Sequence, residues 1–163
     1  MNLSKITFGP GAMRRLFNLW PVFRGAGIRV REIGPDFRSV TVELRAKLLN
    51  RNYVGTHFGG SLFAMTDPFF MIMLLRNLGS EYLVWDKSGS IEYVAPGRGI
   101  VSAHFRLTQE RIDEIKVLAA PGEKIFPQFA VDVLDAGGEV VAKVQKTLYV
   151  RLKPRSRPTG GTA

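Results

Sequence analysis

The sequence predicts an α+β domain in which an antiparallel sheet of about six strands wraps around a central, buried helix. Residues 60–78 are almost entirely apolar, which is typical of a helix buried on all sides. Two segments before this helix and four after it alternate apolar and polar side chains with the period of a β-strand. Strands grouped around a single helix favour an antiparallel sheet over alternating strands and helices.

The chain has 163 residues, a length that suits one domain with a core of its own. We expect this domain to occupy residues 28–153, preceded by a helical extension at 1–27 and followed by a disordered basic tail at 154–163. The chain contains no cysteine, which excludes disulfides, thiolate nucleophiles and cysteine-ligated metals.

The formal net charge of +9 favours an anionic partner, such as nucleic acid, acidic lipid or a phosphorylated ligand. We do not expect nucleic acid, because the sequence has no helix-turn-helix, zinc or aromatic-basic RNA motif. No apolar run reaches the roughly 18 residues of a membrane span, so we expect no integral membrane contact. Asn18 and Pro21 interrupt the only stretch that resembles a signal peptide, and we expect a cytoplasmic protein.

Residues 11–23 predict an amphipathic helix that lies over the domain. Its apolar stripe, Leu16, Leu19, Trp20 and Phe23, has the spacing of one helix face. We expect this stripe to pack on the core or on a partner subunit. A membrane-surface role is the alternative, although the helix is short and carries few cations.

The strands follow from alternation and from turn signals. Segments 28–31 and 40–48 predict a hairpin with one wet face, joined by a Gly-Pro-Asp turn at 34–36. Glycine- and proline-containing turns separate the four later runs. These runs cover residues 82–94, 99–108, 126–135 and 140–152.

The segment from Asn52 to Leu75 is the candidate site. Gly59 and Gly60 mark a loop that leads into the helix, and Asp67 stands within the apolar part. An unpaired charge in an apolar environment is costly, and catalytic acids and bases are often found in such places. Pro68 should bend the helix beside Asp67 and leave a carbonyl near Ala64 without its helical partner.

These residues resemble those of a known family. The pattern Asn52-x-x-Gly55-Thr-x-x-Gly59-Gly60-x-Leu62-Phe63-x-x-x-Asp67 is similar to hot-dog fold acyl-CoA thioesterases of the phenylacetate-degradation type, over residues 28–152. Residues 86–99 resemble a branch of that superfamily known only as a domain of unknown function. The resemblance implies a hot-dog fold, an acyl thioester substrate and no cofactor other than the coenzyme A of that substrate.

The resemblance also implies roles for individual residues. Asp67 matches the acid that acts as base or nucleophile, and Asn52 matches a conserved position of the family motif that could position water or the carbonyl group. The family has His directly before Gly-Gly, whereas here Phe58 holds that place and His57 lies one residue earlier. This departure favours an alternative, in which the protein binds an acyl thioester or lipid without cleaving it. A hot-dog hydratase is a further alternative, but the His and acid pairing it requires is missing.

Thioester hydrolysis needs an attacking group and donors for the developing oxyanion. Asp67 could act as general base or nucleophile, and the amides of Gly59 and Gly60 at the helix N-terminus could bind the oxyanion. His57 is a further candidate catalytic residue. Structural roles stay open for all of them: Asp67 could pair with an arginine, the glycines could permit close packing, and Asn52 and His57 could be loop residues. We expect the second histidine, His104, to be structural or to lie on the surface of the sheet, because it stands on a strand between Ala103 and Phe105. Two histidines so placed make no metal site.

The phosphates of coenzyme A would require cations at the rim of the site. Arg98, in a Pro-Gly-Arg-Gly turn, and Lys87 are the candidates, and a solvated surface charge is the alternative for each. A hot-dog monomer has an open sheet edge and an incompletely covered helix. The resemblance therefore implies a homodimer or a dimer of dimers, with the active site between subunits.

Overall fold

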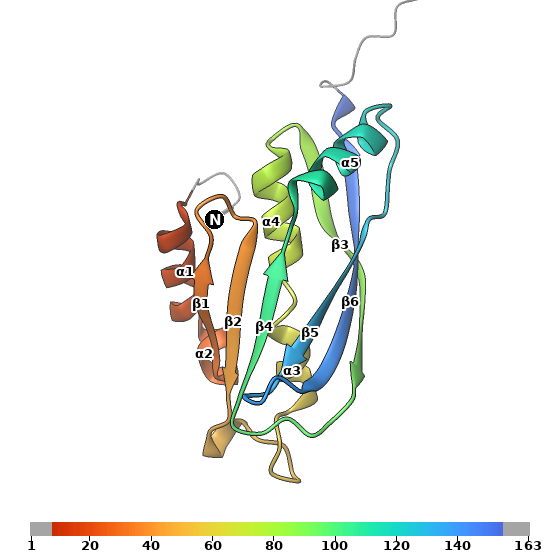
Figure 1. Ribbon diagram of the computed structural model, residues 1–163. Coiled ribbons are helices and arrows are strands. Elements are labelled where there is room, and N and C mark those ends of the chain that lie inside the picture. The colour runs from red at the N-terminus through yellow and green to blue at the C-terminus, as the bar shows by residue number, and fades with distance from the viewer. Residues whose placement is uncertain (1–7, 155–163) are drawn as a thin grey trace, which may run out of the picture.

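A computed structural model describes residues 8–154 and shows a six-stranded antiparallel sheet wrapped around a helix (Figure 1). The strand order is β1-β2-β4-β5-β6-β3. The strands are β1 (Ile28–Ile33), β2 (Ser39–Arg45), β3 (Tyr82–Tyr93), β4 (Ile100–Arg106), β5 (Gln128–Leu134) and β6 (Val140–Leu152). The helices are α1 (Pro10–Leu19), α2 (Pro21–Ala26), α3 (Gly59–Ala64), α4 (Phe69–Leu78) and α5 (Gln109–Ala119), with a 3-10 turn η2 (Leu48–Asn50).

The predicted sheet is confirmed, because each strand lies within a few residues of its predicted segment. Strand β6 is 13 residues long and pairs with β5 on one side and β3 on the other. Its alternate residues from Ala142 to Leu152 are buried and face α4, as the period of a strand requires. Strands β1 and β3 form the two edges of the sheet.

Helix α4 fills the concave face of the sheet. Phe69, Met73 and Leu74 are fully buried, and Phe69 packs against Phe105 of β4 with ring centroids 5.1 Å apart. Met71, Ile72 and Leu75 remain partly exposed. The composition had predicted a helix buried on all sides. Within a single chain, α4 instead keeps a partly exposed face.

The predicted single, bent helix is instead two helices. Helix α3 ends at Ala64, a turn follows, and Pro68 is the N-cap of α4 rather than an interior residue. The N–H of Asp67 donates to the Ala64 carbonyl at 3.3 Å, so the carbonyl that was expected to be unoccupied has a partner. Proline at a helix start requires no backbone donor, which explains why the chain breaks here and does not merely bend.

The N-terminal helix differs from its prediction in the same way. Trp20 separates α1 from α2, which begins at Pro21, and the residues that face the core are Phe17 and Phe23. Leu16, Leu19 and Trp20 of the predicted stripe are exposed. Within the described residues, packing of the predicted stripe on the core is therefore confirmed for Phe23 alone, since a second helix begins at Pro21. Packing of the other three side chains on a partner subunit stays a prediction.

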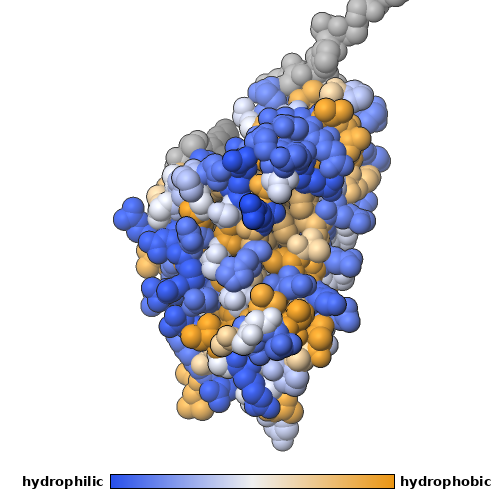
Figure 2. Space-filling view, in the orientation of Figure 1, coloured by the Kyte–Doolittle hydropathy of each residue, from blue (hydrophilic) through white to orange (hydrophobic). Residues whose placement is uncertain are grey.

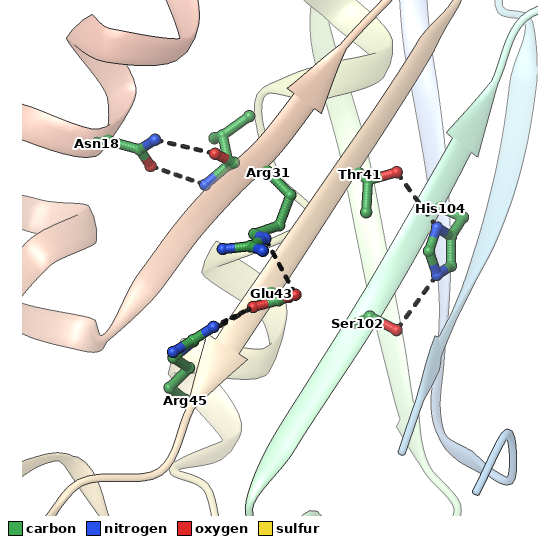
Figure 3. A network of polar contacts seen from close by, with 8 residues as sticks. Asn18, Arg31, Thr41, Glu43, Arg45, Ser102 and His104 are labelled. Carbon is green, nitrogen blue, oxygen red and sulfur yellow. Dashed lines mark hydrogen bonds and ion pairs between the residues drawn. The ribbon is translucent and has the colours of Figure 1, made fainter. Parts of the chain in front are cut away.

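Helix α1 covers the edge of β1. The side chain of Asn18 accepts from the N–H of Val30 at 2.8 Å and donates to its carbonyl at 2.9 Å, as a neighbouring strand would (Figure 3). The helical extension predicted for residues 1–27 thus includes α1 and α2, whereas residues 1–7 lie outside the described part. Of the predicted tail at 154–163, the structure describes Pro154 alone.

Helix α5, between β4 and β5, was not predicted. Its N-cap Thr108 accepts from the N–H of Arg111 at 3.2 Å, and it buries only Ile112, Ile115 and Ala119. So sparse an apolar stripe among charged residues explains why periodicity did not reveal it. Within residues 8–154, no helix is long and apolar enough to cross a membrane.

The chain leaves β2 through η2, where the sequence predicted the end of a strand. Asn50 fixes this turn, because its Nδ2 donates to the carbonyls of Ala26 (2.7 Å) and Arg45 (2.8 Å), and its Oδ1 accepts from the N–H of Lys47 at 2.6 Å. Gly27, with φ +83°, permits this close approach. A Cβ at Gly27 would lie 2.2 Å from Asn50 Nδ2.

We expect Gly27→Ala to lower the free energy of unfolding by about 1–3 kcal/mol, because the methyl group meets the Asn50 amide and the backbone is left-handed. Gly25→Ala is the matched control. Nothing lies within 4 Å of a Cβ at Gly25, which is in helix α2, so this change should stabilise by about 0.5–1 kcal/mol. Urea unfolding of both variants measures the difference, and equal effects would contradict this role of Gly27.

Candidate functional site

The predicted site residues lie around two cavities that meet at Gly60. The larger, of about 650 Å³, is lined by Asn52, His57, Gly59, Gly60 and Arg98, together with Tyr93 and neighbouring loop residues. The smaller, of about 220 Å³, is lined by Gly60 and Asp67, with Phe63, Pro68 and Trp20 among its other walls. One chain therefore brings Asn52, His57 and the glycines together but leaves Asp67 in a separate cavity.

Asn52 organises the loop that leads to α3. Its Nδ2 donates to Thr56 Oγ1 at 2.8 Å and to the His57 carbonyl at 3.1 Å, and its Oδ1 accepts from the N–H groups of Thr56 and Val54 at 3.0 and 3.2 Å. These four bonds use both donors and both lone pairs of the amide. In this conformation Asn52 contributes to the site by fixing the loop.

His57 is buried against the wall of the larger cavity. Its backbone N–H donates to the Gly97 carbonyl at 3.0 Å. No group within residues 8–154 forms a hydrogen bond with its ring nitrogen Nε2. Burial lowers the pKa of the His57 ring below its ordinary value of 6.5; contact with the Gly99 backbone raises it and the charge of Arg51 lowers it, each to a smaller extent. The site thus contains a neutral imidazole with an unpartnered ring nitrogen.

Gly59 and Gly60 begin α3. The N-cap Phe58 gives no side-chain cap, and its carbonyl accepts from the N–H groups of Ser61 and Leu62. Within residues 8–154, neither glycine amide has a backbone acceptor. At both positions glycine also lets an aromatic side chain come close to the backbone. A Cβ on Gly59 would lie 2.8 Å from Tyr93 Oη, and one on Gly60 would lie 2.4 Å from the Phe58 ring.

Asp67 belongs to an ion-pair cluster that the sequence analysis missed. Lys146 of β6 is only 3% exposed, and its Nζ lies 2.7 Å from Asp67 Oδ1 and 3.0 Å from Asp86 Oδ1. Only the contact with Asp67 has hydrogen-bond geometry. Asp67 itself is 58% exposed, so the expected apolar environment of its carboxylate is wrong for the single chain, and its partner is a lysine rather than the arginine considered as an alternative. The buried charge is the lysine, and Asp67 is its partner at the surface.

Gly89 makes room for the lysine. It faces Lys146 across the β3–β6 pair, and a Cβ there would lie 3.0 Å from Lys146 Cδ and 2.9 Å from Phe63 Cζ. The signal for Lys146 was present in the sequence, because it has the same strand parity as Val144 and Leu148, which face the core. A lysine at such a position requires a carboxylate partner.

The candidate cations lie in different places. Arg98 lines the larger cavity, whereas the Nζ of Lys87 lies 4.0 Å above the ring of Phe126. His104 lies on the outer face of the sheet, as predicted, between the hydroxyls of Thr41 and Ser102 at 3.3 Å each (Figure 3). Residues 8–154 contain no group of three or more side chains suited to bind a metal.

The change in stability on replacing Lys146 should depend on whether its carboxylate partners are present. Asp67→Asn with Asp86→Asn leaves a buried ammonium without a carboxylate and should destabilise by about 2–4 kcal/mol, less than for a fully buried pair because Asp67 is solvated. Lys146→Met should destabilise the wild type but stabilise this double variant. Chemical denaturation of all four proteins measures this. Lys146→Met destabilising both backgrounds equally would contradict the ion pairing.

The lowered pKa of His57 predicts that the protein loses stability in acid. Because its pKa in the folded protein is lowered, the unfolded chain binds more protons below the ordinary value of 6.5. The contribution of His57 is therefore fully present above pH 6.5 and is lost as the pH falls below it. We expect thermal unfolding of His57→Gln to show a smaller loss of stability than wild type between neutral and mildly acidic pH. Identical slopes in His57→Gln and wild type would refute this.

Solved structures share this fold at low sequence identity. PA5026 of Pseudomonas aeruginosa, a protein of unknown function and probable thioesterase, has a TM-score of 0.76 and 22% identity, over 86% of this chain and 93% of its own. Thioesterase HI1161 of Haemophilus influenzae has a TM-score of 0.64 and 14% identity, over 91% and 94%. PaaI of Escherichia coli, from the phenylacetic acid degradation operon, has a TM-score of 0.60 and 12% identity, over 86% and 91%.

These likenesses confirm the predicted hot-dog fold. No curated protein matches the sequence. The model of the family described as a domain of unknown function, DUF4442, matches residues 9–150, which include α1, α2 and all six strands except the last two residues of β6. The chain therefore belongs to the DUF4442 family, a branch of the hot-dog fold.

Proposed function

We propose that the protein hydrolyses an acyl thioester, such as an acyl-CoA, with Asp67 as the general base or nucleophile. The observation that carries this proposal is the position of Asp67. Its carboxylate lies in the break between α3 and α4, is bound through Oδ1 by the buried Lys146, and is open to solvent. A fixed and accessible carboxylate on a fold shared with thioesterases suits attack on a thioester.

The reaction needs one proton to be taken and returned. Lys146 binds one oxygen of Asp67, and the other oxygen can accept the proton of a water molecule as its oxygen attacks the thioester carbon. The tetrahedral intermediate then breaks the C–S bond, and the thiolate receives the proton from Asp67. The products are a carboxylic acid and a thiol. If Asp67 attacks directly, an acyl anhydride forms first and water then hydrolyses it.

The larger cavity provides groups for the rest of the substrate. The amides of Gly59 and Gly60 can donate to the oxyanion, and the unpartnered Nε2 of His57 can bond a polar group of the acyl thioester. Arg98 at the same cavity can bind the phosphates of coenzyme A. Lys87 is a weaker candidate for this role because it stacks on Phe126. Asn52 keeps the loop in place.

Two subunits would unite the two cavities. Asp67 and Gly59 line different cavities in one chain, and α4 keeps a partly exposed face. The 12-residue strand β3 has no strand on its outer side within the described residues. Antiparallel pairing of β3 with its copy would continue the sheet and bring Asp67 of one chain toward the loop of the other. We therefore propose a homodimer, either alone or within a dimer of dimers.

Asp67→Asn should lower hydrolysis of acyl-CoA by about 10²–10⁴-fold, because the amide can neither accept the proton nor attack. Thiol release from a panel of acyl-CoAs measures kcat/KM. Asp132→Asn, an exposed carboxylate of β5, is the control and should retain wild-type activity. An Asp67→Asn protein as fast as wild type would exclude Asp67 as base and nucleophile.

Phe58 favours a second candidate function, the binding of an acyl thioester without cleavage. The exposed Phe58 stands directly before Gly59-Gly60, where the thioesterases have histidine, and His57 is buried. The same panel separates the two functions. If the wild-type protein binds acyl-CoA and releases no thiol, then the binding function replaces hydrolysis.

A further inference from the structure

Two adjacent leucines project into solvent at one end of the molecule. Leu48 and Leu49 of η2 are 87% and 96% exposed. Turn η2 and the loop after it protrude below the sheet in Figure 1. The exposed Tyr53 and Val54 belong to that loop. Single apolar residues are common on protein surfaces, but a cluster of extended apolar side chains indicates a surface that meets an apolar partner.

The leucines are held in this position. The three hydrogen bonds of Asn50 tie η2 to the Arg45 and Ala26 carbonyls and to the backbone N–H of its N-cap, Lys47, and Gly27 leaves the space for them. The turn is therefore anchored to both β2 and α2. The exposure of Leu48 and Leu49 follows from a built support rather than from a loose loop.

A basic cavity of about 410 Å³ adjoins the leucines. It is lined by Arg24, Arg29, Arg45 and Lys47, with Asn18, Gly27 and Ile28. Arg45 pairs with Glu43 at 3.0 Å, whereas no carboxylate within residues 8–154 pairs with the other three cations. Residues 46–66, which contain η2 and the loop, include no Asp or Glu. Figure 2 shows hydrophobic patches beside strongly hydrophilic ones at this end.

We propose that this end of the protein docks on the surface of an anionic phospholipid bilayer. Leu48 and Leu49 would enter the boundary of the acyl chains, and the basic cavity would receive a lipid phosphate. Apolar side chains flanked by cations are the combination that binds such interfaces, because apolar burial adds to attraction by the negative surface. The proposal goes beyond the proposed hydrolysis and does not depend on it.

A second copy of the chain fits this surface less well. In a two-fold symmetric interface the same patch meets itself, so the cations of one copy, Arg24 and Lys47 among them, would face the cations of the other without carboxylates between them. The net charge of +9 on each chain adds to this repulsion. An anionic bilayer offers the complementary charge and an apolar layer together.

Vesicle flotation tests the proposal with the full chain. Wild type should float with phosphatidylcholine vesicles that contain about one-third phosphatidylglycerol, and binding should weaken with rising salt and in vesicles of phosphatidylcholine alone. Leu48→Ser with Leu49→Ser should weaken binding to the anionic vesicles by at least about tenfold. Arg24→Gln with Lys47→Gln should remove most of the preference for anionic lipid.

The matched control lies on helix α5, at the other end of the molecule (Figure 1). Val117 and Leu118 are adjacent, apolar and exposed, but acidic residues precede them at Asp113 and Glu114. Val117→Ser with Leu118→Ser should bind as wild type does. The proposal is overturned if wild type ignores anionic vesicles, or if both serine pairs have equal effects. It is also overturned if the Leu48 and Leu49 pair changes the mass by light scattering but not vesicle binding, because the end is then a subunit interface.

Discussion

The buried ammonium of Lys146 determines how the parts of this molecule meet. It extends from β6 beneath the central helices, needs Gly89 of β3 to pass, and ends between Asp67 and Asp86. A charge so deeply buried is tolerated only when its partners stay in place. A single side chain therefore ties the break between α3 and α4 to the paired strands β3 and β6, and the accessible carboxylate is held where these three elements converge.

The rest of the site depends on the loop before α3. Asn52 uses all of its hydrogen-bonding groups to shape that loop, which buries His57 and leaves the amides of Gly59 and Gly60 without backbone partners among the described residues. The carboxylate and the loop line separate cavities with only Gly60 in common. Each half is rigid by itself, which is the condition under which two chains could assemble a precise site without further rearrangement.

The sequence predicted the sheet well, because alternation reports directly which face of a strand is buried. It predicted helices less well. The break at Pro21 put Phe17 rather than Leu16 against the core, and Pro68 started a helix instead of bending one. The burial of Lys146 was not predicted, because a charged residue on a strand usually faces water. Its place in the alternation of β6, together with Val144 and Leu148, puts it on the buried face. The exposure of Asp67 could not be predicted from local composition, since it depends on how the two helices separate.

The bonds between Asn18 and Val30 affect how far the sheet can grow. With α1 over the edge of β1, the outer side of β3 is the one uncovered sheet edge within residues 8–154. A chain with one uncovered strand edge can pair with only one other chain, whereas a chain with two such edges can continue to pair and form a fibre. By bonding to the edge of β1, the side-chain amide of Asn18 thus limits association through strands to two chains.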